Sequence, residues 1–82
     1  MLKEQMIPIA EIYIPTGRRK TLDAAKAEAL AEDILENGQQ VPIQVRQGKG
    51  RFVLVEGLHR LEACISLGDE QISAFLVQAR KF

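Results

Sequence analysis

Apolar residues recur with two different periods along this chain, and the period predicts which segments are helices and which are strands. A three- and four-residue spacing begins at Thr21 or Asp23, either of which can cap a helix. It ends at Asn37-Gly38, a typical helix stop. The apolar face of this predicted helix consists of Ala27, Leu30, Ala31, Ile34 and Leu35.

Three other segments have strand character. Residues 41–46 alternate apolar with polar side chains and residues 51–55 are mainly apolar, so they predict a β-hairpin around the Gln47–Gly50 turn. Residues 6–15 predict a short strand, or an extended segment with a turn, and the prolines at both ends favour a sheet edge. Residues 72–77 predict a final strand.

The strand over residues 51–55 leads through Gly57 into a second predicted helix, which ends at Leu67-Gly68. Its apolar positions are Leu58, Leu61, Cys64 and Ile65. The order of strand, helix, hairpin, helix and strand predicts an α+β fold in which a small mixed β-sheet packs against two helices. Residues 1–82 are expected to form a single domain.

The turn formed by residues 57–60 is the main candidate for a binding site. A helix that starts directly after a strand leaves backbone N–H groups and the positive end of the helix dipole free to bind an anion. Arg60 adds a guanidinium and His59 a titratable ring within the same turn. The sequence therefore predicts an anion site at this junction.

Net charge is zero, but the charges are unevenly distributed. Residues 16–20, predicted as a polar loop, and residues 44–60 are rich in basic side chains, whereas residues 23–36 are mainly acidic. Arg18 and Arg19 of the loop could grip phosphate oxygens, although basic loops are also simply solvated. The acidic segment includes an exposed stripe at a spacing of four residues, Glu28, Glu32 and Glu36.

Composition excludes several classes of protein. One cysteine cannot form an internal disulfide, and one cysteine with one histidine cannot supply a typical zinc site. The chain contains no long apolar run and no secretory signal, so we expect a cytoplasmic protein that does not enter a membrane. An open sheet edge would allow a homodimer.

Several pieces of sequence, taken in order, carry a family resemblance. They are an Ile-x-x-Ile segment followed by a proline and a basic pair, a helix ending in Asn-Gly, Val-Pro-Ile-x-Val, Val-Glu-Gly-Leu-His-Arg, Ala-x-x-x-Leu-Gly and Ile-x-Ala-x-x-Val. Over residues 6–78 this set resembles the ParB-like domain of the ParB and sulfiredoxin superfamily. The resemblance implies a phosphate- or nucleotide-binding cradle made by Gly57, Leu58, His59 and Arg60.

The chain departs from the sulfiredoxin pattern at its reactive position. Leu58 stands where sulfiredoxins carry the catalytic cysteine, so sulfinic acid reductase activity is not expected. Cys64 is expected to be buried and inert. Lys26 resembles a lysine that contacts nucleotide in sulfiredoxins, but Ala29 and Asp33 replace hydroxyl residues on the same helix, and a carboxylate there would repel phosphate.

Resemblance to partition ParB proteins implies a nucleoside triphosphate, ATP or CTP, with Mg²⁺ as its companion ion, and a role with DNA or a DNA-bound protein. The chain ends before the DNA-reading and dimerisation segments of those proteins, so full partition function is not expected of these residues alone. A second hypothesis is a small Mg²⁺-dependent nuclease or phosphotransferase with Glu56 and His59 as catalytic residues. A third is a protein-interaction module with a vestigial site.

Both candidate catalytic residues also have structural interpretations. Glu56 could form a salt bridge with Arg46 or Arg51 at the end of a strand. His59 could hydrogen-bond back to the sheet and lock the turn, and Arg60 could pair with an acid of the first helix such as Asp33.

Overall fold

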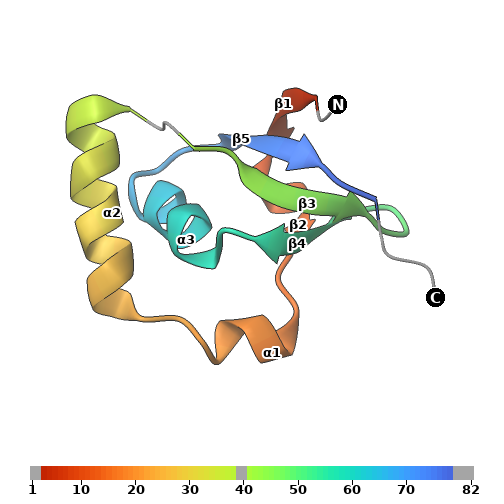
Figure 1. Cartoon of the computed structure of the whole chain (residues 1–82), viewed down its shortest axis with the longest axis horizontal. Helices are drawn as coiled ribbons and strands as arrows, with labels where there is room; N and C mark the ends of the chain where they lie inside the picture. Colours follow the sequence, from red (N-terminus) through yellow and green to blue (C-terminus); the bar gives the residue numbers. More distant parts are fainter. Residues whose placement is uncertain (1–2, 39–40, 79–82) are drawn as a thin grey trace.

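The computed structural model describes residues 3–38 and 41–78. Along the chain it contains β1 (Glu4–Pro8), the 3₁₀ turn η1 (Ile9–Glu11), β2 (Ile12–Tyr13), α1 (Thr16–Arg19), α2 (Ala24–Asn37), β3 (Ile43–Gln47), β4 (Phe52–Glu56), α3 (Leu58–Ser66) and β5 (Gln71–Leu76). Figure 1 shows the sheet beside the helices α2 and α3, with α1 set apart from both.

The five strands form one mixed sheet in the order β1-β5-β3-β4-β2. The pairs β1/β5 and β3/β4 are antiparallel, whereas β3/β5 and β2/β4 are parallel. The predicted hairpin is confirmed as β3 and β4. The segment 6–15 is extended with a turn, as one of the two alternatives stated, and its strands β1 and β2 take the two edges of the sheet.

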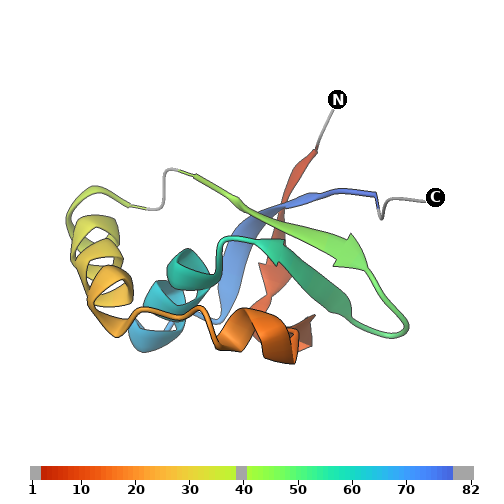
Figure 2. The same ribbon diagram turned by 60° about the horizontal axis from the view of Figure 1, so that its bottom comes forward.

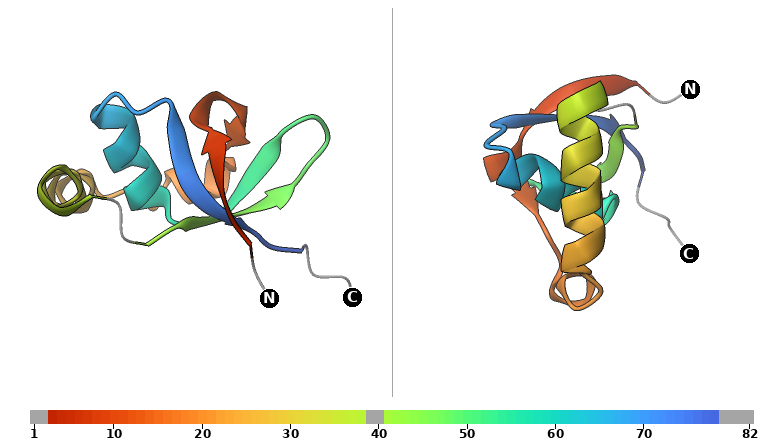
Figure 3. Two further views of the ribbon diagram at one scale, coloured as in Figure 1. Left: turned by 90° about the horizontal axis from the view of Figure 1, so that it is seen from above. Right: turned by 90° about the vertical axis from the view of Figure 1, so that its left-hand side faces the viewer.

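α3 lies between the sheet and α2 (Figures 1 and 3). It packs against β3 on one side and against α2 on the other. The core is made of aliphatic side chains from the strands and from α3, and among its fully buried members are Ile7, Ile43, Val45, Leu61, Cys64 and Ile72. The predicted α+β fold is confirmed, with α3 as the helix next to the sheet.

Three local predictions were wrong, and one of them concerns Ile65, which was placed on the apolar face of the second helix but is 42% exposed on α3. Thr16–Arg19 is a single turn of helix and not a loop, because Pro15 at its start offers its carbonyl to the N–H groups of Arg18 and Arg19. One turn is too short to show a periodic pattern. Leu35 is 75% exposed although it was placed on the apolar face of α2. α2 packs against a single helix, α3, and not against the broad face of the sheet. The buried stripe of α2 is therefore narrow and centres on Ile34.

The ends of α2 agree with the sequence. Asp23 is the N-cap, and its Oδ1 accepts hydrogen bonds from the N–H groups of Ala25 and Lys26 at 3.0 and 3.4 Å. Gly38 follows the last turn with a positive φ of 77°. In the described part of the chain, none of the helices combines the length and the apolar character needed to cross a membrane.

Candidate functional site

The junction between β4 and α3 is built on Gly57. This residue has a φ of 105°, which side-chain-bearing residues rarely adopt. A Cβ atom added to it would lie 2.7 Å from Cγ2 of Ile43, on the neighbouring strand β3. Only glycine therefore allows β4 to turn into α3 while its backbone passes against β3.

The N-terminus of α3 carries no side-chain cap among the described residues. The first intrahelical bond runs from the N–H of Leu61 to the carbonyl of Gly57 at 2.9 Å. Geometry leaves the N–H groups of Leu58, His59 and Arg60 without helical acceptors. Leu58 is 5% exposed and its side chain belongs to the core, so its backbone N–H is the group that it could offer to a ligand.

A hollow of about 360 Å³ opens at this helix start. Its walls come from α1, the segment after α1, α2 and the β4–α3 junction, through Arg18, Thr21, Leu30, Glu56, Gly57, Leu58, His59 and Arg60. The predicted residues 57–60 and Arg18 are thus brought together. Thr21 and Leu30 were not predicted to line it, because Thr21 was considered as a helix cap and Leu30 was assigned to the apolar face of the helix.

Strand pairing explains how α1 reaches this hollow. β2 runs parallel to β4, with Tyr13 opposite Val53. The carboxyl ends of both strands therefore lie at the same end of the sheet, where β2 leads into α1 and β4 leads into α3. Figure 2 shows α1 below the sheet and the segment after it passing in front of α3 on its way to α2. Only two residues of each strand are paired, and they are far apart along the chain, so no local sequence pattern predicts this pairing.

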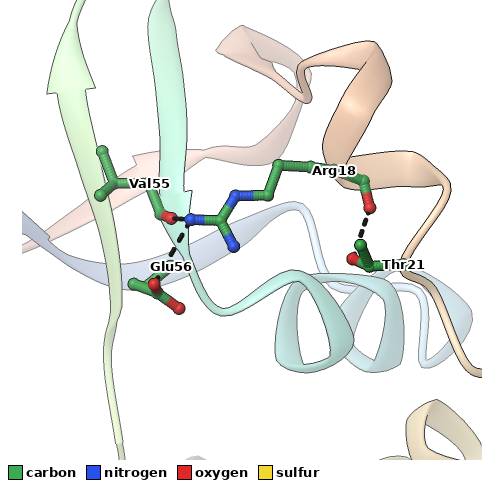
Figure 4. Close-up of polar contacts among 4 residues, drawn as sticks. All are labelled: Arg18, Thr21, Val55 and Glu56. Atoms are coloured by element: carbon green, nitrogen blue, oxygen red, sulfur yellow. Dashed lines mark hydrogen bonds and ion pairs between the residues drawn. The ribbon is translucent and has the colours of Figure 1, made fainter.

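Arg18 reaches from α1 to the end of β4 (Figure 4). Its Nη2 donates to the carbonyl of Val55 and lies 3.3 Å from Oε1 of Glu56. The hydroxyl of Thr21 donates to the carbonyl of Arg18 at 2.7 Å and holds the turn beneath it. Glu56 therefore does form a salt bridge with an arginine, as the structural interpretation expected, but its partner is Arg18 and not Arg46 or Arg51.

His59 links the starts of the two long helices. Its Nε2 accepts the backbone N–H of Asp23, the N-cap of α2, at 2.9 Å. An accepting Nε2 carries no proton, so this bond belongs to the neutral ring with its proton on Nδ1. The bond goes to α2 and not to the sheet, and it fixes the ring at the border of the hollow.

A second hollow of about 410 Å³ lies beside the first, between α2 and α3. It is mainly apolar and is lined by Lys26, Ala29, Leu30, Asp33 and His59. Leu30 and His59 line both hollows, so the two are neighbours. Lys26 thus lines the hollow beside the start of α3, whereas Arg19 lines neither hollow.

Asp33 does not form the predicted pair with Arg60. Its Oδ1 accepts from Nδ2 of Asn37 at 3.0 Å, one turn along α2. Among the residues that the structure describes, Arg18 and Glu56 form an ion pair, whereas Arg60, which lines the hollow, has no carboxylate partner. In the same described residues, no three His, Cys, Asp or Glu side chains lie close enough together to hold a metal ion.

Cys64 is separate from this site. It is fully buried in α3, as expected. Burial, and then the negative charge of Asp69 and a hydrogen bond with it, raise the pKa of the thiol to about 11. A thiol with this pKa remains protonated and unreactive at neutral pH.

Comparison with known proteins decides the family. The profile of the ParB N-terminal domain matches residues 2–81. The chain belongs to the ParB N-terminal domain family. The resemblance drawn from the sequence is therefore confirmed.

Three curated relatives lie in two branches of the superfamily. The chain is 37% identical over 62 residues to a probable chromosome-partitioning protein ParB of Campylobacter jejuni, covering 76% of this chain and 22% of the relative. It is 35% identical over 71 residues to a nucleoid occlusion protein of Halalkalibacterium halodurans, covering 85% and 25%. A sulfiredoxin of Arabidopsis thaliana is 36% identical over 62 residues, covering 76% and 50%. The matched part of the chain spans between about a fifth and a half of these proteins.

Solved structures share the ParB-domain fold. Sulfiredoxin of Arabidopsis thaliana superposes with a TM-score of 0.83 at 30% identity, over 94% of this chain and 86% of that one. The chromosome-partitioning protein ParB of Caulobacter crescentus, solved with CTP-γ-S, has a TM-score of 0.82 at 24% identity, over 96% and 46%. A free serine kinase solved with ADP has a TM-score of 0.78 at 18% identity, over 90% and 30%.

Proposed function

We propose that this ParB domain binds a nucleotide, ATP or CTP, with the phosphates at the Gly57–Arg60 turn. The observation that carries the proposal is that an uncapped helix N-terminus and two arginines, Arg18 and Arg60, line one hollow. Backbone N–H groups, the helix dipole and planar guanidiniums are the donors that phosphate oxygens accept. A phosphate would provide the cap that α3 lacks.

The neighbouring apolar hollow is suited to the nucleoside. Leu30 and Ala29 offer apolar surface, and Lys26 adds a cation at its border. Asp33 lines this second hollow and not the one at the start of α3, so we expect its carboxylate to face the nucleoside and not the phosphates. This arrangement would lessen the repulsion expected from the sequence.

Relatives support both the ligand and its setting. CTP-γ-S was solved with the Caulobacter ParB and ADP with the serine kinase, and both share this fold. The relatives named for chromosome partitioning and nucleoid occlusion support a cytoplasmic role in a partition or regulatory system that acts with DNA or a DNA-bound protein.

Calorimetric and thermal titration with ATP, CTP, GTP and inorganic phosphate, each with and without Mg²⁺, tests the proposal. A ligand at one hundred times its dissociation constant should stabilise the fold by about 2.7 kcal/mol, a shift of several degrees for so small a domain. Arg60→Ala should remove most of this shift, because it deletes the cation without an ionic partner. Arg46→Ala, an arginine outside the hollow, is the matched control. Binding that survives Arg60→Ala unchanged would refute the site.

A second candidate function rests on the position of Glu56. Its carboxylate borders the proposed phosphate site and is 64% exposed at the side chain, so it could bind Mg²⁺ or accept a proton from a substrate. Nuclease or phosphotransferase activity would then be Mg²⁺-dependent and lost in Glu56→Gln, with folding and nucleotide binding retained. Equal turnover by Glu56→Gln would exclude this role for Glu56.

A further inference from the structure

The turn of the β3–β4 hairpin is a second concentration of positive charge, apart from the site described above. Residues 41–55 contain Arg46, Lys49 and Arg51 and no aspartate or glutamate. Within the described residues the recorded ion pair joins Arg18 to Glu56, so these three cations have no carboxylate partner there. The charge of the hairpin is therefore not neutralised locally.

Strand register places the arginines on one surface. Val53 of β4 is paired with Arg46 of β3 and with Tyr13 of β2, so the three side chains form a row across neighbouring strands on the same face of the sheet. The guanidinium carbon of Arg51 lies 3.9 Å from the centre of the Tyr13 ring. Arg46 therefore stands at one end of the row, and Arg51, stacked on Tyr13, stands at the other. Two strand spacings separate these ends by about 10 Å.

Stacking prepares Arg51 for binding. A guanidinium that lies over an aromatic ring keeps its N–H donors at the edge, where they can contact phosphate, and loses less conformational entropy when it does so. Tyr13 is 38% exposed, so the stacked pair is at the surface.

The opposite end of the molecule is acidic. The long axis measures 39 Å, and Figure 1 together with the left view of Figure 3 shows α2 at one end of it and the β3–β4 turn at the other. α2 has one lysine against four carboxylates, Glu28, Glu32, Asp33 and Glu36. The neutral chain therefore carries a charge separation along its length, which would turn the hairpin towards a polyanion and α2 away from it.

We propose that the β3–β4 turn binds the phosphate backbone of double-stranded DNA without regard to base sequence. The choice of DNA among polyanions rests on the proposed function, whereas the nucleotide hollow plays no part in the contact. Phosphate contacts by three cations predict a slope of about −2.7 in a plot of log affinity against log salt concentration. The expected affinity is that of a non-specific contact, with a dissociation constant of about 10⁻⁴ to 10⁻⁶ M.

Fluorescence anisotropy of a labelled 30-base-pair duplex, titrated with the chain at several concentrations of KCl, tests this inference. The double variant Arg46→Gln/Arg51→Gln should weaken binding at low salt by at least about 10-fold and reduce the salt slope by about 2. Lys3→Gln/Lys20→Gln removes the same charge elsewhere on the surface and should change the affinity by less than about 2-fold. A second duplex of unrelated sequence should bind equally well.

The outcomes separate this proposal from the nucleotide site. Nucleotide titration of Arg46→Gln/Arg51→Gln should match the unmodified chain, and its circular dichroism should be unchanged. Equal loss of DNA affinity in the two double variants would overturn the hairpin as the contact. No detectable binding of the unmodified chain at 20 mM KCl would overturn it as well, as would tighter binding to polyglutamate than to the duplex.

Discussion

The two long helices of this domain begin in opposite ways. α2 is capped from within the chain, because the carboxylate of Asp23 accepts the N–H groups of Ala25 and Lys26. α3 begins at Gly57, which has no side chain to offer. One helix start is thus capped from within the fold, whereas the other has no side-chain cap among the described residues. His59 joins the two through the backbone N–H of Asp23.

The largest effect on stability is expected from Gly57→Ala. The added Cβ would be 2.7 Å from Ile43, and the backbone would keep an unfavourable positive φ. We expect a loss of about 3 kcal/mol in the free energy of unfolding, measured by urea denaturation. Gly38→Ala also places a side chain at a positive φ, 77° in place of 105°, but meets no close contact and should cost less, about 1 to 2 kcal/mol. Equal costs for the two variants would show that the approach to β3 is unimportant.

High pH should destabilise the interior of α3. The pKa of Cys64 is raised to about 11 in the folded chain, above the ordinary value of 9.0. The folded state therefore holds this proton more tightly, and the resulting stability is present below pH 9 and lost as the pH rises towards 11. The loss should be about 2 to 3 kcal/mol. Comparing the pH dependence with that of Cys64→Ala isolates it, and parallel curves would contradict the assignment.

Removing the cap of α2 should have a smaller effect. Asp23→Ala leaves the N–H groups of Ala25 and Lys26 without their acceptor and should cost about 1 kcal/mol in urea denaturation. Asp23→Asn keeps an accepting oxygen and should cost less. A cost for Asp23→Asn as large as that for alanine would mean that charge, and not capping, is what matters.

The smallest effect is expected at the bond that links the helix starts. His59→Leu removes the acceptor of the Asp23 N–H and should cost about 0.5 to 1 kcal/mol. Hydrogen exchange of the Asp23 amide should become faster in this variant, while exchange within the middle of α2 should change little. His59→Gln provides another acceptor and should slow that exchange again. An Asp23 amide that is indifferent to both changes would show that the bond does not persist in solution.

Local patterns were enough to predict most elements of this fold. Asp23 and Asn37-Gly38 marked the ends of α2, and Gly57 marked the change from strand to helix, because caps and glycines act on their immediate neighbours. The pairing of Arg18 with Glu56 could not be predicted. These residues are 38 positions apart, and only the parallel pairing of β2 with β4 brings them together.

Burial on α2 was mispredicted for a related reason. Periodicity shows which residues share a helix face but not how wide a surface that face meets. Because α2 packs on another helix, Ile34 is buried while the next residue, Leu35, is exposed. The roles of the residues around the hollow, in binding or in catalysis, remain predictions to be tested.

The most direct test of the open helix start is amide NMR. With ¹⁵N-labelled chain, inorganic phosphate and the nucleotides ATP and CTP would be titrated while the amides of Leu58, His59 and Arg60 are followed beside that of Ala25. We expect saturable downfield shifts at the start of α3, where N–H groups gain an acceptor, and little change at the start of α2, where the N–H of Ala25 is already bonded. Saturable binding that leaves residues 58–60 unmoved, or shifts both helix starts equally, would contradict it.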